Sequence, residues 1–256
     1  MSFLEHIDEL RRRLIVIIVA VGSITVFCFT FGIKNVEIGE YSIYIPYPNI
    51  YRNISALFLE RLKSDLLPEY VKLIVTTPAQ AMVALIYVSL FLGIAFGMPV
   101  IIFELARFIG PGLYSHEKKV TGKIILPASG LFLLGAIFSY RLVIPWTIDF
   151  LFRYGVALDV ETFLTIEGFI SFVLLFILAF GLSFQLPIVM VVLSSLDIVD
   201  PGFWKRNFRY AVLGMLIFGA IITPDGSGIT MFMVAAPMIV LYLAGYLVAV
   251  RGKKKE

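Results

Sequence analysis

Residues 168–196, GFISFVLLFILAFGLSFQLPIVMVVLSSL, decide the fold class, because they contain no charged side chain. The run is longer than the roughly 20 residues that cross a bilayer as a helix. Similar apolar runs occupy residues 79–104 and 124–146, and the chain of 256 residues is 60% hydrophobic and 15% charged. Soluble domains are about 45–50% apolar and about 25% charged. The sequence therefore predicts an all-α integral membrane protein and excludes a soluble enzyme, a DNA-binding module and a disulfide scaffold.

The chain is expected to cross the membrane six times. The predicted spans are 14–32, 79–104, 124–146, 168–196, 211–223 and 229–250. The fifth span is unusually short, because about 13 residues reach only about 20 Å across a hydrocarbon core about 30 Å thick. We therefore predict a single membrane domain, residues 1–256, folded as a cupped bundle with short fifth and sixth helices in a locally thin membrane.

Basic residues indicate the orientation of the spans. They are concentrated in short segments that six crossings would place on one side: Arg11, Arg12, Arg13, Arg107, Lys118, Lys119, Lys123, Lys205, Arg206, Arg209, Arg251, Lys253, Lys254 and Lys255. By the positive-inside rule, both termini are cytoplasmic, and the net charge of +3 requires no nucleic-acid partner. We expect a multi-pass protein of the cell membrane. Residues 33–78, with Pro46, Pro48 and Pro68, are expected to form an extracytoplasmic cap with an amphipathic helix at Ile54–Leu67.

Motifs for catalysis are absent from the sequence. His116-Glu117-Lys118-Lys119 begins like the zinc-protease motif HExxH, but Val120 stands where the second histidine would have to be. The other histidine is His6, and no GxxxxGK[ST] phosphate-binding loop occurs. We expect no enzyme activity, no metal site and no cofactor. The lone cysteine, Cys28, lies in an apolar run and is interpreted as a small buried hydrophobe.

Carboxylates near the predicted cytoplasmic face are candidates for binding a cationic partner. Glu5 and Glu9 share one face of a helix and precede three arginines, although acidic residues also stabilise a helix N-terminus without any partner. Glu117 follows the turn-forming residues 110–112 and has the same alternative, as a first-turn acid of the next helix. Position alone leaves both interpretations open.

Polar residues in the fourth span and the last hairpin form a second set of candidates. Pro187, in the segment SFQLP that begins at Ser183, removes a backbone donor and predicts a kink. Gln185 brings an amide to membrane depth, where it either faces a partner helix or a water-lined concavity, or is satisfied within the bundle. Asp225, in the turn at residues 224–228, is either a functional residue or a turn and helix cap.

Together these segments resemble the TatC family, the multi-spanning receptor subunit of the twin-arginine protein translocase. The resemblance is carried by four blocks in the same order: His6–Leu14 (HIDELRRRL), Phe108–Lys119 (FIGPGLYSHEKK), Ser183–Pro187 (SFQLP) and Thr223–Asp225 (TPD). It implies a receptor whose cytoplasmic face binds the twin-arginine signal peptides of folded cargo proteins. It also implies export driven by the transmembrane proton gradient.

The same resemblance implies roles for individual residues. Glu9 and Glu117 match the family's recognition carboxylates, and Phe108 matches an aromatic position beside them. Carboxylates suit a twin-arginine motif because they pair more strongly and more directionally with Arg than with Lys. Gln185 and Pro187 match the surface where single-span partners of the TatA/TatB type assemble. The family commonly has Glu at this position, and a glutamine cannot take up or release a proton.

Asp225 matches a part of the family's outer cap that matters for assembly. The lipid bilayer and other copies of the chain are the remaining expected partners, and nucleic acid is not one. Two other functions stay open. One is a small-solute transporter that uses Gln185, Glu104 and the broken fourth helix, and the other is a membrane scaffold without a binding role.

Overall fold

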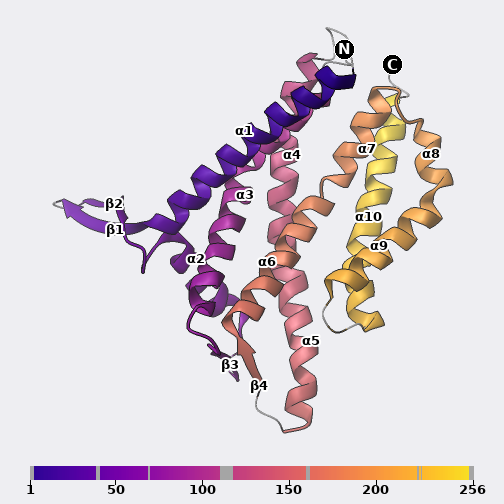
Figure 1. Cartoon of the computed structure of the whole chain (residues 1–256). Helices are drawn as coiled ribbons and strands as arrows, with labels where there is room; N and C mark the ends of the chain where they lie inside the picture. The colour runs from indigo at the N-terminus through magenta and orange to yellow at the C-terminus, as the bar shows by residue number, and fades with distance from the viewer. Residues whose placement is uncertain are drawn as a thin grey trace. The chain divides into compact units, whose positions relative to one another are not determined.

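The chain is predominantly helical in the computed structural model, which describes residues 3–38, 41–68, 70–109, 118–159, 162–223, 225 and 227–253 (Figure 1). Five helical stretches among these residues are long and apolar enough to cross a membrane: Glu5–Thr30, Gln80–Phe108, Ile124–Arg153, Ile166–Ser195 and Gly228–Gly252. This agrees with the predicted all-α membrane class. The structure divides into a first unit, Met1–Gly112 with Phe152–Leu174, and a second unit, Leu113–Leu151 with Leu175–Glu256.

Two long helices, α1 (Phe3–Thr30) and α3 (Gln80–Ile109), pack along each other in the first unit. Gly93 of α3 permits the close approach. A Cβ atom there would collide with Thr25 Oγ1 and would lie 2.8 Å from the backbone oxygen of Val21, both on α1. Small residues at such contacts allow membrane helices to gain van der Waals packing. The sequence of α3 therefore builds a tight contact with α1.

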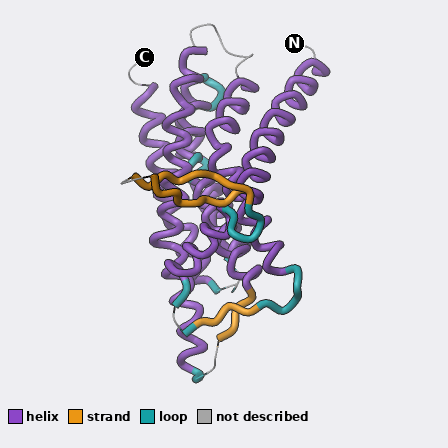
Figure 2. The backbone as a smooth tube through the Cα atoms, turned by 90° about the vertical axis from the view of Figure 1, so that its left-hand side faces the viewer, coloured by secondary structure: helices purple, strands orange, loops and turns teal. Residues whose placement is uncertain are grey.

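The predicted cap follows α1 and precedes α3 in the sequence, and it has more regular structure than expected. Figure 2 shows its strands in orange. An antiparallel hairpin pairs β1 (Phe31–Ile38) with β2 (Tyr41–Pro48), and α2 (Ile54–Leu66) follows at the predicted amphipathic helix. Further along, β3 (Val71–Ile74) pairs in parallel with β4 (Thr162–Thr165).

Buried polar side chains tie the cap to the long helices. Asn53 has no exposed surface. Its Nδ2 donates to the backbone oxygen of Phe29 at 2.7 Å, and its Oδ1 accepts from the Ala56 N–H at 2.7 Å, which caps α2. The hydroxyl oxygens of Ser55 and Ser89 are 2.6 Å apart and join α2 to α3. These bonds satisfy polar groups that would otherwise be costly to bury.

Three helical elements follow one another without a break at the start of the second unit. These are α4 (Lys118–Phe138), a π-helical turn η2 (Ser139–Val143) and α5 (Ile144–Ala157), whose last residues belong to the first unit. The remaining helices are α6 (Ile166–Ser183), which begins in the first unit, α7 (Leu186–Ser195), α8 (Pro201–Arg206), α9 (Phe208–Ile222) and α10 (Gly228–Lys253).

Glycines also permit the contact of α4 with the second half of α6. A Cβ atom at Gly135 would lie 2.6 Å from the backbone oxygen of Phe180, and one at Gly181 would lie 2.6 Å from Cε2 of Phe132. Both phenylalanines are almost completely buried. Large rings packed against glycine backbones therefore form the core of this contact.

The structure confirms some of the predicted elements and corrects others. The helix corresponding to the fifth span, α9, is short, with 15 residues. The prediction of a short sixth helix is wrong, because α10 has 26 residues and continues through Pro237. Proline is tolerated within membrane helices. At the first span, α1 begins at Phe3 and ends at Thr30, two residues before the predicted end, because β1 begins at Phe31.

Candidate functional site

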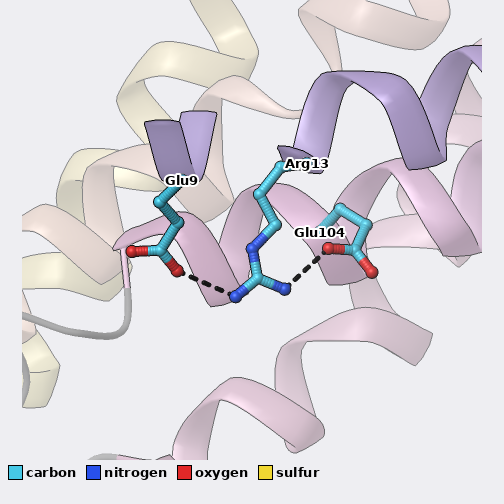
Figure 3. A network of polar contacts seen from close by, with 3 residues as sticks. All are labelled: Glu9, Arg13 and Glu104. Carbon is cyan, nitrogen blue, oxygen red and sulfur yellow. Dashed lines mark hydrogen bonds and ion pairs between the residues drawn. The ribbon is translucent and has the colours of Figure 1, made fainter. Parts of the chain in front are cut away.

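A network of three charged side chains joins α1 to α3 (Figure 3). It lies near the N-terminal end of α1, which is predicted to be on the cytoplasmic side. The Arg13 guanidinium lies between two carboxylates: Nη2 is 2.8 Å from Glu9 Oε1, and Nη1 is 2.8 Å from Glu104 Oε2. The side chains of Arg13 and Glu9 are 17% and 16% exposed, and that of Glu104 is 8% exposed. We refer to Glu9, Arg13 and Glu104 as the carboxylate cluster.

Helix geometry explains why these side chains meet. Glu9 and Arg13 are four residues apart on α1, so they lie on the same face one turn from each other. Glu104 lies in the last turns of α3, which packs along α1. The α1–α3 contact thus places an acidic side chain of one helix against the arginine of the other.

The carboxylate cluster carries an excess of negative charge. Two carboxylates share one guanidinium, so the three groups have a net charge of −1 when all are ionised. Among the described residues, the buried atoms Glu9 Oε2 and Arg13 Nε have no hydrogen-bond partner. Buried polar atoms are rarely left in this state. Glu9 therefore retains an acceptor oxygen that its contact with Arg13 does not use.

An aromatic pair lies on the same two helices. The rings of His6 on α1 and Phe108 on α3 stack with centroids 4.5 Å apart and planes inclined by 22°. His6 precedes Glu9 by about one helical turn, and Phe108 follows Glu104 by about one turn. The structure thus brings Phe108 to the same end of the α1–α3 pair as Glu9. A binding site that contains both residues requires this arrangement.

Glu117, the other predicted recognition carboxylate, lies outside the described residues. Arg13 and Glu104 are the residues that sequence reasoning did not assign to this site. The sequence indicates Arg13 as part of the orientation signal and of the block His6–Leu14, and Glu104 as part of the alternative transporter site. A signal was available for Glu104, because a carboxylate that ends an apolar run needs a partner. The structure supplies that partner in Arg13.

Gln185 and Pro187 lie in the second unit, where the fourth predicted span breaks. α6 ends at Ser183 and α7 begins at Leu186, which confirms the predicted interruption. The Gln185 side chain donates from Nε2 to the backbone oxygen of Ala128 on α4, at 3.0 Å. This is the contact expected of a glutamine satisfied within the bundle.

An apolar cavity of about 250 Å³ lies beside the break. Its lining residues come from α4, α7 and α10: Ile124, Pro127, Pro187, Ile188, Val191, Val192 and Val248. The cavity offers Pro187, but no charged group, to an occupant. It can accept an aliphatic side chain or a lipid chain and cannot by itself recognise a cation.

Asp225 lies before α10 and is bound to its first turn. Its Oδ1 accepts a hydrogen bond from Thr230 Oγ1 at 2.6 Å. Desolvation raises the pKa of Asp225, but hydrogen bonds from Ser227 and Thr230 favour the charged form and bring the pKa below its ordinary value. These contacts are those of a turn and helix cap.

Comparisons with known proteins agree with the resemblance in the four sequence blocks. The family described as Sec-independent protein translocase protein (TatC) matches residues 5–237. The protein named Sec-independent protein translocase protein TatC of Cenarchaeum symbiosum is 46% identical over 256 residues, covering all of this chain and 97% of that protein. The protein of the same name from Aquifex aeolicus is 34% identical, over 94% of this chain and 92% of that protein.

A solved structure is also similar to this fold. It is described as the crystal structure of the twin arginine translocase receptor TatC, and it superposes with a TM-score of 0.80 at 31% sequence identity. The match covers 97% of this chain and 99% of that one. The similarity therefore extends over both units.

Proposed function

The chain belongs to the TatC family of Sec-independent protein translocase proteins, and from this membership and the carboxylate cluster we propose that it binds twin-arginine signal peptides. The binding site contains Glu9, Phe108 and Glu117 and lies on the cytoplasmic face. The peptides belong to folded cargo proteins that the translocase exports with energy from the proton gradient. The protein acts as a receptor and performs no catalysis.

The pairing of Glu9 with a guanidinium is the observation that carries this proposal. Arg13 Nη2 binds Glu9 at 2.8 Å, which is a charge-assisted hydrogen bond of the kind that a signal-peptide arginine would form. The stacked ring of Phe108 lies on the adjacent helix. It offers a second arginine an apolar or cation–π surface. A neutral or purely apolar helix end would have no means of selecting arginine.

The proposed topology places this site in the cytoplasm. Residues 1–256 form one membrane domain with six crossings, made by the five longer helical stretches and the shorter helix α9. The basic segments lie on the cytoplasmic side with both termini, as the positive-inside rule requires. The protein is accordingly a multi-pass protein of the cell membrane. The family match, which extends over residues 5–237, supports treating both units as one such domain.

Partner subunits are proposed to contact the second unit. Single-span proteins of the TatA/TatB type bind beside the helix break, at Gln185 and Pro187, where the apolar cavity can accept an aliphatic side chain. Gln185 contributes hydrogen bonds and no titratable proton. Asp225 supports assembly through the hairpin that it caps.

Binding of a twin-arginine peptide and of its twin-lysine version to the detergent-solubilised protein tests the receptor function. The wild-type protein is expected to prefer the arginine peptide by about tenfold, because Arg pairs more directionally with carboxylates. Glu9→Gln and Glu117→Ala should each abolish the preference. Glu60→Gln, a change of an exposed carboxylate on α2, is the matched control and should preserve it. Equal affinity of the wild type for both peptides would contradict the proposal.

A further inference from the structure

We propose that Glu104 is a positioning residue for signal-peptide binding, because it offsets the charge of Arg13 and so leaves Glu9 available to an incoming arginine. This inference rests on the proposed receptor function. Glu104 lies outside the four sequence blocks of the family resemblance. Its role follows from its contact with Arg13.

Charge balance is the first step of the argument. Arg13 is in direct contact with Glu9, and these two groups alone would be neutral. A neutral pair would attract a peptide guanidinium only weakly. Glu104 adds a second negative charge on the opposite side of the same guanidinium, so that the carboxylate cluster keeps a net charge of −1. The site can then attract a cation even though an arginine already occupies it.

Hydrogen-bond geometry is the second step. An arginine commonly binds one carboxylate with two parallel hydrogen bonds that engage both oxygens. Here Arg13 divides its two terminal nitrogens between two carboxylates: Nη2 binds Glu9 and Nη1 binds Glu104. Glu9 is therefore held through Oε1 alone, and Oε2 has no donor among the described residues. This oxygen is buried, so an arginine from the peptide would satisfy it after displacing the atoms that cover it.

Burial separates the roles of the two carboxylates. The side chain of Glu104 is 8% exposed, half the exposure of Glu9, and it belongs to the helix opposite Arg13. A side chain so covered acts on the peptide through Arg13 and not by contact. Glu104 therefore sets the charge and orientation of the site, while Glu9 receives the ligand.

Three variants test the inference through their effects on affinity for a twin-arginine signal peptide. Glu104→Gln keeps the shape but makes the carboxylate cluster neutral, and should weaken binding by about tenfold. Arg13→Gln removes the competing cation and should bind at least as tightly as the wild type. The double variant with both changes restores the net charge of −1 and should return to within about threefold of the wild type.

Stability is measured in parallel by thermal unfolding and gel filtration in detergent, so that only folded variants are compared. If Glu104→Gln does not fold, Glu104→Asp replaces it. That variant keeps the charge and should retain wild-type affinity, and a tenfold loss would overturn the inference. If the Arg13–Glu104 pair had only a structural role, all three variants would bind the peptide more weakly, and the double variant would show no recovery.

The outcomes also separate this inference from the proposed function. Wild-type affinity of Glu104→Gln, or a double variant as weak as Glu104→Gln alone, overturns the role of Glu104. The receptor function survives both results if the wild type still prefers arginine to lysine and Glu9→Gln removes that preference. Loss of the preference in the wild type itself would instead overturn the receptor function.

Discussion

The α1–α3 contact in the first unit and the α4–α6 contact in the second unit use the same packing device but have different polar groups. In both, a glycine lets one backbone approach the other: Gly93 in the first and Gly135 in the second. The first contact ends in the charged carboxylate cluster, which retains an unused acceptor at Glu9. The second ends in a neutral amide, Gln185, which binds a backbone oxygen of its own bundle.

The difference separates a site that can select a charged ligand from one that cannot. A charged group with an unused acceptor can gain a hydrogen bond when a ligand arrives, and it selects for charge. A neutral amide that already donates to a neighbouring helix can still form hydrogen bonds with a partner subunit, but it does not select for charge. The two polar sites therefore differ in the kind of ligand that each can recognise.

The largest expected effect comes from breaking the glycine contact itself. Gly93→Val would place side-chain atoms on Thr25 and on the backbone of Val21, and should lower the free energy of unfolding by about 3 kcal/mol. Gly135→Val should cost a similar amount. Thermal unfolding in detergent measures both. Gly22→Val and Gly130→Val are matched controls because no atom lies within 4 Å of a Cβ built there. Equal stabilities of Gly93→Val and Gly22→Val would refute the packing argument.

A smaller effect is expected at the cap of the first unit. Asn53→Ala removes the cap of α2 and the hydrogen bond to Phe29, and should lower the free energy of unfolding by about 2 kcal/mol. Chemical or thermal unfolding measures the loss. Asn207→Ala is the control, since the Asn207 side chain is less buried and makes no side-chain cap of α9. If the stability of Asn53→Ala were unchanged, the packing of residues 33–78 against the long helices would not depend on this residue.

The neutral amide of the second unit should matter less. Gln185→Leu deletes the hydrogen bond to Ala128 and should cost about 1 kcal/mol, the usual net value of one such bond. If Gln185 has no part in signal-peptide binding, the affinity for the signal peptide stays at the wild-type value while stability falls. Loss of arginine-over-lysine preference in Gln185→Leu would erase the distinction between the two contacts.

The smallest expected effect is a pH dependence at the last hairpin. The pKa of Asp225 lies below its ordinary value, so its ionised form is favoured in the folded state. The resulting stabilisation is present above the ordinary aspartate pKa of about 4 and is lost as the pH falls through the lowered pKa. Thermal unfolding of the wild type and of Thr230→Val between about pH 5 and pH 2 measures it. The variant should show the shallower loss, and identical curves would exclude this contribution.

Apolar length and helix breakers were the features that the sequence predicted well. The apolar runs matched helices, the short apolar stretch between Arg209 and Pro224 in the sequence predicted the short α9, and the interruption before Pro187 followed from its missing backbone donor. These properties are local. A run of apolar residues or a proline acts on its own segment whatever the rest of the chain does.

Properties that depend on distant partners were missed. The β1–β2 hairpin went unrecognised because Pro46 and Pro48 made its second strand resemble a loop. The pairing of Arg13 with Glu104 joins residues 91 positions apart. No local pattern of the sequence indicates which helix faces α1. For the same reason Glu9 and Phe108 were assigned by family resemblance, and their proximity became visible only in the packed helices.

The π-helical turn η2 has a consequence for how α4 and α5 share one helical stretch. A π-helical turn accommodates one residue more than an α-helical turn, and one residue corresponds to a rotation of about 100° about the axis. Deleting a single residue within Ser139–Val143 would therefore convert η2 into an ordinary helical turn and leave the start of α5 facing as it does now, so Ile144 and Ile148 would stay buried. A chain of unchanged length that was α-helical through Ser139–Val143 would instead rotate α5 by about 100° and turn that face outward. The π-helical turn thus absorbs one extra residue without changing which face of α5 is buried.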